Sequence, residues 1–303
     1  MSASVIAVVG ATATGKSDLA LDLADAIGAE IVNADAMQLY RGMDIGTAKV
    51  PVDQRRGIPH HQIDVLRVDQ EASVAAYQHH GREDLNRIAS RGRTAIVVGG
   101  SGLYVRALLD RMSFPGTDPA LRTELEERAV REGASNLHRE LARLDPEAAQ
   151  RIDPRNQRRV IRALEVIHLT GSPFSANLPD YRYEVPAVQI GLAMPAAQLD
   201  ARIDTRARQM FDGGLVEETE RLLEEGLEWG RTANRAVGYV QALAVLRGRM
   251  NKAEAVAETA LATRQLARRQ RKWFRRDPRV HWIDAGEDAF DQAIAHIRRS
   301  AAD

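Results

Sequence analysis

The most restrictive feature of this 303-residue chain is the octapeptide GATATGKS, which spans Gly10 to Ser17. It satisfies the pattern G-x-x-x-x-G-K-[ST] and lies between the apolar run VIAVV (5–9) and a helix expected over 15–27. Small residues in such a turn let consecutive backbone N–H groups face an anion at a helix N-terminus. Lys16 would reach the outer phosphates, and the Ser17 hydroxyl can hold Mg²⁺. The motif therefore predicts a P-loop on a strand of a parallel sheet.

Short β-branched runs alternate with helix-length amphipathic stretches around this motif. Strands are expected at 29–34, 94–98, 187–194 and 279–285, and helices near 73–90, at 101–110 and through 196–276. Alternation of this kind is typical of a parallel sheet with crossover helices. We therefore expect the α/β class, with a P-loop kinase-like core.

One segment interrupts this pattern. MSFPGTDP (112–119) contains two prolines and a glycine, and the helical sequence after it closes with GSPF (171–174). We expect a discontinuous P-loop core domain at 1–111 and 187–303. The residues between them, 112–186, are expected to form an inserted and mainly helical domain.

Composition narrows the class of protein further. The chain has no cysteine, which excludes disulfides, thiolate catalysis and zinc sites built on cysteine. It carries 42 basic and 42 acidic residues, so only the distribution of charge can point to an anionic partner. No apolar run approaches the roughly 20 residues that a membrane helix needs. We expect a soluble, monomeric, cytoplasmic protein without a membrane partner.

The P-loop motif alone does not identify the molecule whose phosphates it binds. In most P-loop NTPases a strand that ends in Asp supplies a second contact to the metal. Here the corresponding strand runs into the glycine-rich GGSG (99–102), whereas Asp35 follows the strand EIVNA. The carboxyl ends of neighbouring parallel strands face one crevice, so Asp35 and Lys16 should share a pocket. The alternative is that Asp35 caps the turn or helix that follows it.

Two basic segments are candidates for nucleic-acid contact. Arg155, Arg158, Arg159 and Arg162 follow the spacing i, i+3, i+4, i+7, which predicts one helical face. Seven basic residues and no acid lie between Arg264 and Arg276. Two such stripes would suit a phosphate backbone, although each alone is also typical of a solvated helix surface.

Three smaller features have plainer interpretations. His60 and His61 are adjacent and are expected to pack in a loop rather than to share a metal. Trp273 and Phe274 are expected in the core, because they fall on the apolar side of their helix. RAVGYV (235–240) is read equally well as an ordinary helix entry or as a phosphate contact.

Seven longer motifs spread along nearly the whole chain resemble the tRNA dimethylallyltransferase family. They are GATATGKS (10–17), NADAMQLYRGMDIGTAK (33–49), PHHQID (59–64), VVGGSGLYVRAL (97–108), RRVIRALEV (158–166), RAVGYVQ (235–241) and ATRQLARRQRKWFRR (262–276). The resemblance implies a P-loop core with an inserted helical domain that binds tRNA. It implies transfer of the prenyl group of dimethylallyl diphosphate to N6 of the adenosine 3′-adjacent to the anticodon, with release of diphosphate. The partner is then the tRNA anticodon stem-loop, and Mg²⁺ is the cofactor.

The resemblance also implies roles for individual residues. Those expected to bind the donor diphosphate, or a nucleotide such as ATP, are Gly10, Ala11, Thr12, Ala13, Thr14, Gly15, Lys16 and Ser17. Ser17 would hold Mg²⁺, and Arg206 resembles an additional arginine at the diphosphate. Asp35 fits the general base, ionised at neutral pH without special tuning, since the reference pKa of Asp is about 3.9. Residues expected to contact tRNA are Asp35, Ala36, Met37, Gln38, Ser101, Arg158, Arg159, Arg162, Arg235, Gly238, Arg264 and Arg268.

The chain departs from the family pattern at three positions. Ala11 stands where proline is common, Ala36 where serine is usual, and Ser101 where threonine is common. The change at Ala36 removes a hydroxyl that could contact RNA, whereas Ser101 keeps one.

Two other functions fit parts of the sequence. A P-loop kinase acting on a small hydroxylated metabolite would use the P-loop and Asp35, but it leaves the arginine stripes unexplained. An RNA-binding switch that holds a nucleotide without chemistry would leave the RNA unchanged in mass.

Overall fold

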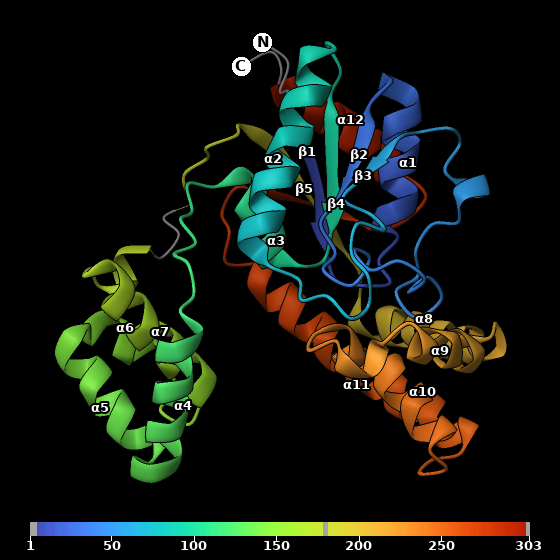
Figure 1. Cartoon of the computed structure of the whole chain (residues 1–303). Coiled ribbons are helices and arrows are strands. Elements are labelled where there is room, and N and C mark those ends of the chain that lie inside the picture. Colours follow the sequence, from blue (N-terminus) through green and yellow to red (C-terminus); the bar gives the residue numbers. More distant parts are fainter. Residues whose placement is uncertain (1–4, 178–180, 301–303) are drawn as a thin grey trace. The chain divides into compact units, whose positions relative to one another are not determined.

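A computed structural model describes residues 5–177 and 181–300 of the chain (Figure 1). The chain divides into two compact units: Met1–Leu109 with Tyr183–Asp303, called here the core unit, and Asp110–Arg182, called the insertion unit. The boundaries expected from the sequence lie within a few residues of these.

The core unit is built on a six-stranded parallel sheet with the order β3-β2-β4-β1-β5-β6. The strands are β1 (Val5–Gly10), β2 (Glu30–Asn33), β3 (His60–His61), β4 (Ala95–Gly99), β5 (Ala187–Ala193) and β6 (Val280–Asp284). Val9 in β1 stands beside Gly99 of β4 and Gly191 of β5, so the three central strands end at nearly the same level. The expected parallel α/β class is confirmed.

One strand differs from the sequence-based interpretation. His60 and His61 form β3, which pairs with Ile31 and Val32 of β2, so the expectation of a loop at these histidines was wrong. The strand has only two residues and no β-branched side chain, so its sequence carries no strand pattern. It is a strand only because its backbone pairs with β2.

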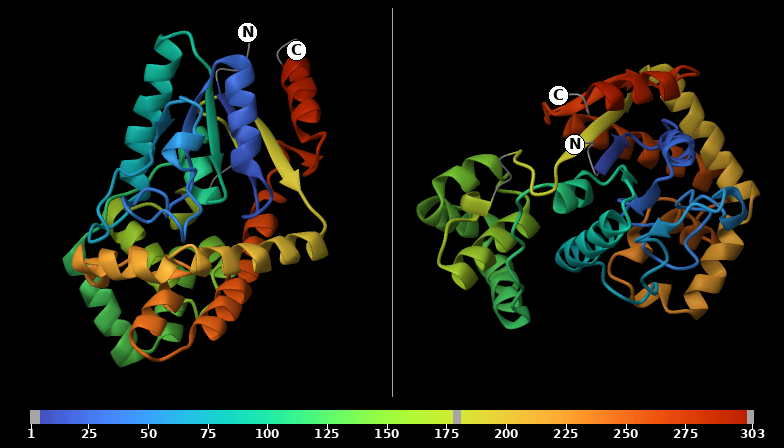
Figure 2. Two further views of the ribbon diagram at one scale, coloured as in Figure 1. Left: turned by 90° about the vertical axis from the view of Figure 1, so that its right-hand side faces the viewer. Right: turned by 90° about the horizontal axis from the view of Figure 1, so that it is seen from above.

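Helices cover both faces of the sheet (Figure 2). They are α1 (Lys16–Ile27), α2 (Val74–Ser90), α3 (Gly102–Leu109) and α12 (Ala289–Ser300). Residues of α1 and α12 pack on Ile6, Val8 and Ile190 in one buried cluster. Helices α2 and α3 pack on each other at the other face. The sheet is therefore buried on both sides, as its nearly continuous apolar strands require.

A second group of helices lies beyond the carboxyl ends of the strands (Figure 1). It comprises α8 (Ala196–Asp212), α9 (Leu215–Glu224), α10 (Tyr239–Leu246) and α11 (Lys252–Phe274), with short 3₁₀ turns at Leu227–Trp229 and Ala233–Arg235. Tyr40 and Met43, from the segment after β2, share a buried cluster with Phe211, Leu215 and Tyr239 of these helices. This cluster fixes the segment after β2 against α8, α9 and α10.

The insertion unit is helical. It contains α4 (Pro119–Glu132), α5 (Ala134–Leu144), α6 (Pro146–Arg151) and α7 (Gln157–Thr170). Helices α4 and α6 begin with proline after an Asp cap, Asp118 and Asp145, as expected where the first helical N–H has no partner. Leu125, Leu137 and Leu164 lie in its own buried core. None of the described helices in either unit has the length and apolar composition needed to cross a bilayer.

Candidate active site

The P-loop, Gly10–Ser17, connects the end of β1 to the start of α1. Gly10 and Gly15 adopt φ values of 138° and 91°, and Ala13 is also left-handed at 65°. A Cβ on Gly10 would lie 3.0 Å from the Leu192 carbonyl oxygen, so the loop needs glycine there both for its dihedral angle and for its close approach to β5. The Thr14 hydroxyl donates to the Ala11 carbonyl at 2.9 Å and holds the turn.

Two cations face this loop. The Lys16 Nζ donates to the Ala11 carbonyl at 2.6 Å. Burial lowers the pKa of Lys16 to about 8, although the Asp35 carboxylate raises it and Arg206 lowers it further. Arg206 extends from α8, and its Nη1 donates to the Thr12 hydroxyl at 3.4 Å. The loop therefore places two positive groups where an anion would be cradled.

Asp35 follows β2 and is held by its neighbours. The Asn33 Oδ1 accepts from the Asp35 amide at 2.9 Å, and the Asn33 Nδ2 donates to the Asp35 carbonyl at 3.0 Å. The Asp35 Oδ1 accepts from the Met37 amide at 2.9 Å, so Asp35 does cap the turn, as the alternative interpretation held. Burial raises the pKa of Asp35, and the Met37 amide and Lys16 lower it in part. Burial therefore makes Asp35 a stronger base than the reference pKa of an exposed aspartate indicates.

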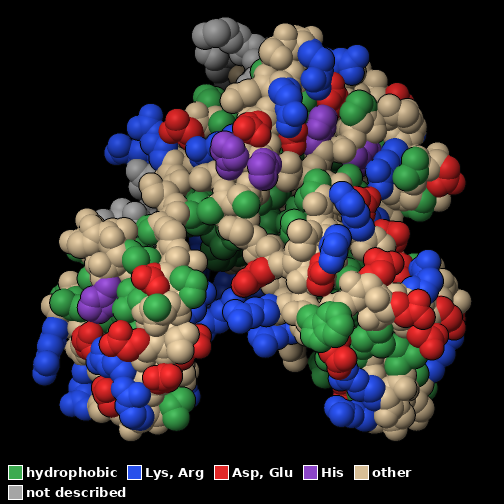
Figure 3. Space-filling model, viewed as in Figure 1, with side chains coloured by type: hydrophobic (Ala, Val, Ile, Leu, Met, Phe, Trp, Pro, Cys, Tyr) green, Lys and Arg blue, Asp and Glu red, His purple; other side chains and the backbone are tan. Residues whose placement is uncertain are grey.

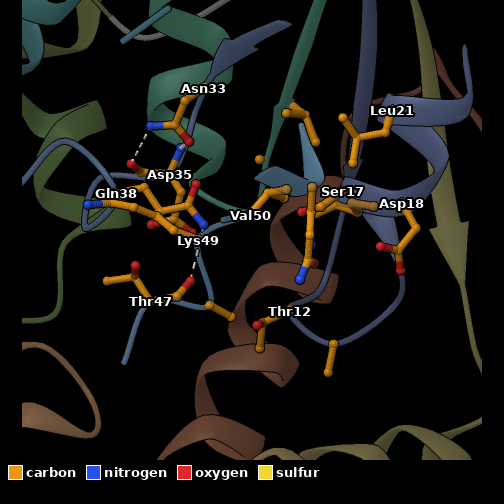
Figure 4. Close-up of a pocket in the computed structure, with 18 of the residues that line it drawn as sticks. Thr12, Ser17, Asp18, Leu21, Asn33, Asp35, Gln38, Thr47, Lys49 and Val50 are labelled. Carbon is orange, nitrogen blue, oxygen red and sulfur yellow. Dashed lines mark hydrogen bonds between the residues drawn. The ribbon is translucent and has the colours of Figure 1, made fainter. Parts of the chain in front are cut away.

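Two cavities meet at these groups. The first, called the P-loop cavity, is about 540 Å³ and is lined by the P-loop, Asp35, Gln38 and Arg206. The second, called the apolar cavity, is about 310 Å³ and shares Thr12, Asp35 and Arg206 with the first. Figure 4 shows the P-loop cavity, with Thr12, Ser17 and Asp18 on one side and Asn33, Asp35 and Gln38 on the other. The expectation that Asp35 and Lys16 share a pocket is confirmed.

The lining of the apolar cavity differs from that of the P-loop cavity. Its walls include Met37, Ile203, Met210, Val237 and Leu266, and two arginines, Arg235 and Arg269, also line it. A group entering this cavity would meet apolar side chains with positive charge beside them, and it would reach Asp35 and Arg206.

Ser17 is the expected metal ligand. Its side chain makes no hydrogen bond among the described residues and lines the P-loop cavity beside Asp18, so the hydroxyl is available to a ligand there. A hard oxygen next to a cradle for phosphates fits Mg²⁺. Within 5–177 and 181–300, the only three His, Asp or Glu groups close enough to share an ion are His79, His80 and Glu83, which are exposed on α2.

The glycine-rich segment Gly99–Gly102 has a packing role that the sequence did not reveal. A Cβ on Gly99 would lie 2.2 Å from the Ala34 carbonyl oxygen, and one on Gly102 would lie 2.1 Å from Trp273. A Cβ on Gly100 would lie 2.4 Å from the Gln270 Nε2. The segment is glycine-rich because β2 and α11 approach it this closely. Trp273 packs here and is 37% exposed, whereas Phe274 is 2% exposed, so the expectation of core packing was right only for Phe274.

Gln270 is a site residue that the sequence interpretation missed. Its Oε1 accepts from the Thr12 amide at 2.8 Å. Thr12 was among the residues expected to bind the donor diphosphate, which would use its backbone amide. In the structure this amide is instead satisfied by α11, which leaves the later amides of the loop for a ligand. The only signal of Gln270 in the sequence is that it is an uncharged polar residue within a run of basic residues.

Four other residues expected at the RNA site, Ala36, Gln38, Ser101 and Gly238, take part in hydrogen bonds within the protein. The Ala36 amide donates to the Ser101 hydroxyl at 3.2 Å, and the Gln38 Nε2 donates to the Thr47 carbonyl at 3.1 Å. Gly238 precedes α10 with φ 92°, and its amide donates to the Gln241 side chain at 2.9 Å. Ala36 and Ser101 thus join the Asp35 turn to the glycine-rich segment.

The arginines of the insertion unit separate into two groups. Arg158 and Arg159 are exposed in the first turn of α7. Arg155 lies before the helix and pairs with Asp153, so the prediction that Arg155 belongs to the basic face of this helix was wrong. Arg162 donates to the Pro115 and Gly116 carbonyls and to the buried Glu165, and is therefore tied to the fold of its own unit.

The arginines of α11 are also not all free of acids. Figure 3 shows Lys and Arg side chains gathered over the C-terminal part of this helix. Arg264 pairs with Asp204 of α8, so an acid reaches the stripe from another helix although none lies within it. Arg268 is exposed, and so is Arg235 in the turn before α10. Arg268 and Arg235 are better placed than Arg264 to meet an external anion.

Comparison with known proteins gives consistent matches. The profile of the family described as IPP transferase matches residues 38–277. The chain is 54% identical to the tRNA dimethylallyltransferase of Thermobifida fusca, over 97% of this chain and 94% of that protein. It is 55% identical to the tRNA dimethylallyltransferase of a Nocardioides species, over 97% of this chain and 95% of that protein.

Solved structures with the same architecture support the fold. The crystal structure of a full-length tRNA isopentenylpyrophosphate transferase from Bacillus halodurans matches with a TM-score of 0.70 and 38% identity, over 98% of this chain and 95% of that one. A eukaryotic dimethylallyltransferase described as acting on tRNA matches with a TM-score of 0.83 and 25% identity, over 96% and 77%.

Proposed function

The chain belongs to the IPP transferase family, and from this premise we propose that it is a tRNA dimethylallyltransferase. It transfers the dimethylallyl group of dimethylallyl diphosphate to N6 of the adenosine 3′-adjacent to the anticodon and releases diphosphate. The single observation that carries this proposal at the site is that the P-loop and the Asp35 carboxylate line one cavity, which continues past Arg206 into the apolar cavity.

The P-loop side of the site suits the leaving group. As the carbon–oxygen bond of the donor breaks, the electron pair stays with the diphosphate, and negative charge increases on its oxygens. The amides from Ala13 to Ser17, together with Lys16 and Arg206, would stabilise that charge. Mg²⁺ held by Ser17 would supply further neutralisation of the diphosphate. These groups are fixed before the reaction, so little reorganisation is needed.

The Asp35 side suits the acceptor. An exocyclic aromatic amine is a poor nucleophile, and it must lose a proton as the carbon–nitrogen bond forms. Asp35, held by Asn33 and Met37, would accept that proton from N6. The pKa raised by burial makes Asp35 a stronger base than an exposed aspartate, while Lys16 favours its ionised form.

The apolar cavity offers a place for the acceptor base. A purine turned out of an RNA loop has apolar faces, and a closed site needs such a base to exclude water from the cationic allyl fragment. Met37, Val237 and Leu266 provide apolar walls, and Arg235 and Arg269 could bind the flanking phosphates. We propose that the adenine enters through this cavity.

The surface arginines extend the RNA contact. Arg158 and Arg159 on the insertion unit, with Arg235 and Arg268 on the core unit, are exposed cations of the kind that bind RNA backbone. Arg162 and Arg264, which were expected to contact tRNA, have acidic partners in the protein and would contribute less. We further propose that the enzyme works in the cytoplasm and is a monomer. Sedimentation of the purified protein tests the oligomeric state.

One experiment separates this proposal from the alternatives. A tRNA pool is incubated with the protein, Mg²⁺ and dimethylallyl diphosphate, and digested nucleosides are analysed by mass spectrometry. We expect a five-carbon adduct on adenosine. A kinase would instead convert ATP to ADP when given a small hydroxylated acceptor, and an RNA-binding switch would leave the RNA unchanged in mass; either result would contradict the proposal.

A further inference from the structure

Gln270 of α11 lies between two parts of the active site that are distant in sequence. Its side chain is mostly buried, with 9% exposed. At one end its Oε1 accepts from the Thr12 amide at 2.8 Å. At the other end its Nε2 lies so close to Gly100 that a Cβ there would be 2.4 Å away. One side chain therefore contacts both the P-loop and the glycine-rich segment after β4.

Both contacts continue toward the reacting groups. The Thr12 hydroxyl accepts from Arg206 at 3.4 Å, and Thr12 lines both cavities. Next to Gly100, the Ser101 hydroxyl accepts from the Ala36 amide, which follows Asp35 directly. Figure 4 shows Thr12 in front of the helix from which Gln270 extends. Gln270 is thus linked to Arg206 on the donor side through Thr12. It is linked to Asp35 on the acceptor side through Gly100 and Ser101 and then Ala36.

The P-loop requires such support. Ala13 has a φ of 65°, in the left-handed region that a residue with a side chain adopts only at an energetic cost. Its neighbour Thr12 has a backbone N–H that needs an acceptor when it is not exposed to water. Gln270 supplies this acceptor from a different helix, so the orientation of the first half of the loop depends on the position of α11.

Helix α11 also carries cations on its outer side. Arg268 and Arg269 precede Gln270 directly and are exposed, and Arg269 lines the apolar cavity. An anionic polymer bound to these side chains would therefore affect the position of the helical turn whose Gln270 side chain accepts from the Thr12 amide.

We infer that Gln270 is a positioning residue that sets the P-loop through the Thr12 amide and couples RNA bound on α11 to diphosphate bound in the loop. The inference rests on the proposed function for the identity of the two ligands. Coupling of this kind is reciprocal: if RNA changes the affinity for diphosphate by some factor, diphosphate changes the affinity for RNA by the same factor. A side chain that only filled space would not affect that factor.

The test measures the dissociation constant of inorganic pyrophosphate with Mg²⁺ by calorimetry, with and without a saturating anticodon stem-loop RNA. In the native protein we expect RNA to change this constant by about fivefold or more, the lower end of typical coupling between sites. Gln270→Leu removes the acceptor for the Thr12 amide. It should weaken pyrophosphate binding in the absence of RNA and bring the ratio of the two constants close to one.

Two further variants keep the result interpretable. Gln265→Leu alters an exposed glutamine on the same helix and should leave both constants unchanged. Where Gln270→Leu fails to fold, Gln270→Asn serves the same purpose, because its amide is one methylene too short to reach Thr12. Equal pyrophosphate constants with and without RNA in the native protein, or an unaltered ratio in the folded Gln270 variants, would overturn the inference.

The same measurements separate this inference from the proposed function. Pyrophosphate titrations need no turnover, so they report on Gln270 even if no adduct forms. A native protein that makes the adduct while Gln270→Leu retains the native ratio would reject the role of Gln270 alone. A native protein that makes no adduct would reject the proposed function, whatever the titrations show.

Discussion

Lys16 and Asp35 line one cavity at the carboxyl ends of two strands, and burial moves their pKa values toward each other. Burial lowers the pKa of the lysine to about 8 and raises that of the aspartate. Each charge opposes the shift of the other, since the carboxylate raises the pKa of Lys16 and the ammonium lowers the pKa of Asp35. The pair therefore places a weakly held proton and a strengthened base in the same cavity, and the first two predictions follow from it.

Replacing Asp35 by asparagine should lower turnover by about a hundredfold or more, the scale of a lost general base. Asparagine keeps the size of the side chain and its carbonyl acceptor for the Met37 amide. RNA affinity should therefore stay close to that of the native protein. Single-turnover rates and RNA dissociation constants test both statements, and equal rates in the two proteins would remove Asp35 from the mechanism.

Pyrophosphate affinity should fall as pH rises through about 8. Lys16 loses its charge around that pH when the site is empty, and a bound anion raises the pKa, so binding requires uptake of a proton. The loss approaches about tenfold per pH unit above the pKa of the free protein. Titrations with pyrophosphate measure it, and Lys16→Ala should bind weakly and lack the part of the pH dependence that comes from Lys16. The titration of pyrophosphate itself is common to both proteins, so the same pH profile in the native protein and in Lys16→Ala would contradict the role of Lys16.

Removing Asn33 should affect catalysis more than RNA binding. Its side chain makes two hydrogen bonds to the backbone of Asp35 and one to the Gln62 carbonyl. Asn33→Ala would let the carboxylate drift, and we expect turnover to fall by between about tenfold and a hundredfold. The KM for tRNA should change little, because Asn33 is buried. A change confined to that KM would show that Asn33 does not act through Asp35.

Two arginines of α7 should behave differently when each is changed to alanine. Arg159 is exposed, so Arg159→Ala should weaken RNA binding and reduce the slope of the salt dependence by about one. Arg162 pairs with Glu165, which is fully buried, so Arg162→Ala should lower the free energy of unfolding by about 1–3 kcal/mol. Binding at several salt concentrations and denaturant unfolding distinguish the two effects. Identical behaviour of both variants would contradict this division.

Arg264 and Arg268 provide a second comparison on one helix. Arg264 is paired with Asp204, and Arg268 is exposed. Arg268→Ala should therefore weaken RNA binding more than Arg264→Ala does, since the pair already neutralises much of the charge of Arg264. RNA titrations of the two variants at low salt decide the order. The reverse order would indicate that RNA displaces Asp204.

Local patterns determined the architecture in advance. The P-loop motif indicates a glycine-rich turn between a strand and a helix, and alternating strands and helices are typical of a parallel sheet with crossovers. The position of Asp35 at a strand end followed from the same logic, since neighbouring parallel strands end at one edge. The sequence by itself therefore determined the loop, the shared pocket and every strand of the described sheet except β3, which depends on pairing with β2.

Only the tertiary structure decided which partners the side chains have. The Thr12 amide bonds to Gln270, Arg264 pairs with Asp204, and the pKa of Asp35 is raised by burial. Thr12 and Arg264 each bond to a residue that is distant in the chain. The pKa of Asp35 rises because several segments together exclude water from its carboxylate. Charge spacing along one helix cannot reveal an acid on another. The physical reason is that hydrogen bonding and desolvation depend on three-dimensional proximity, which a local motif does not encode.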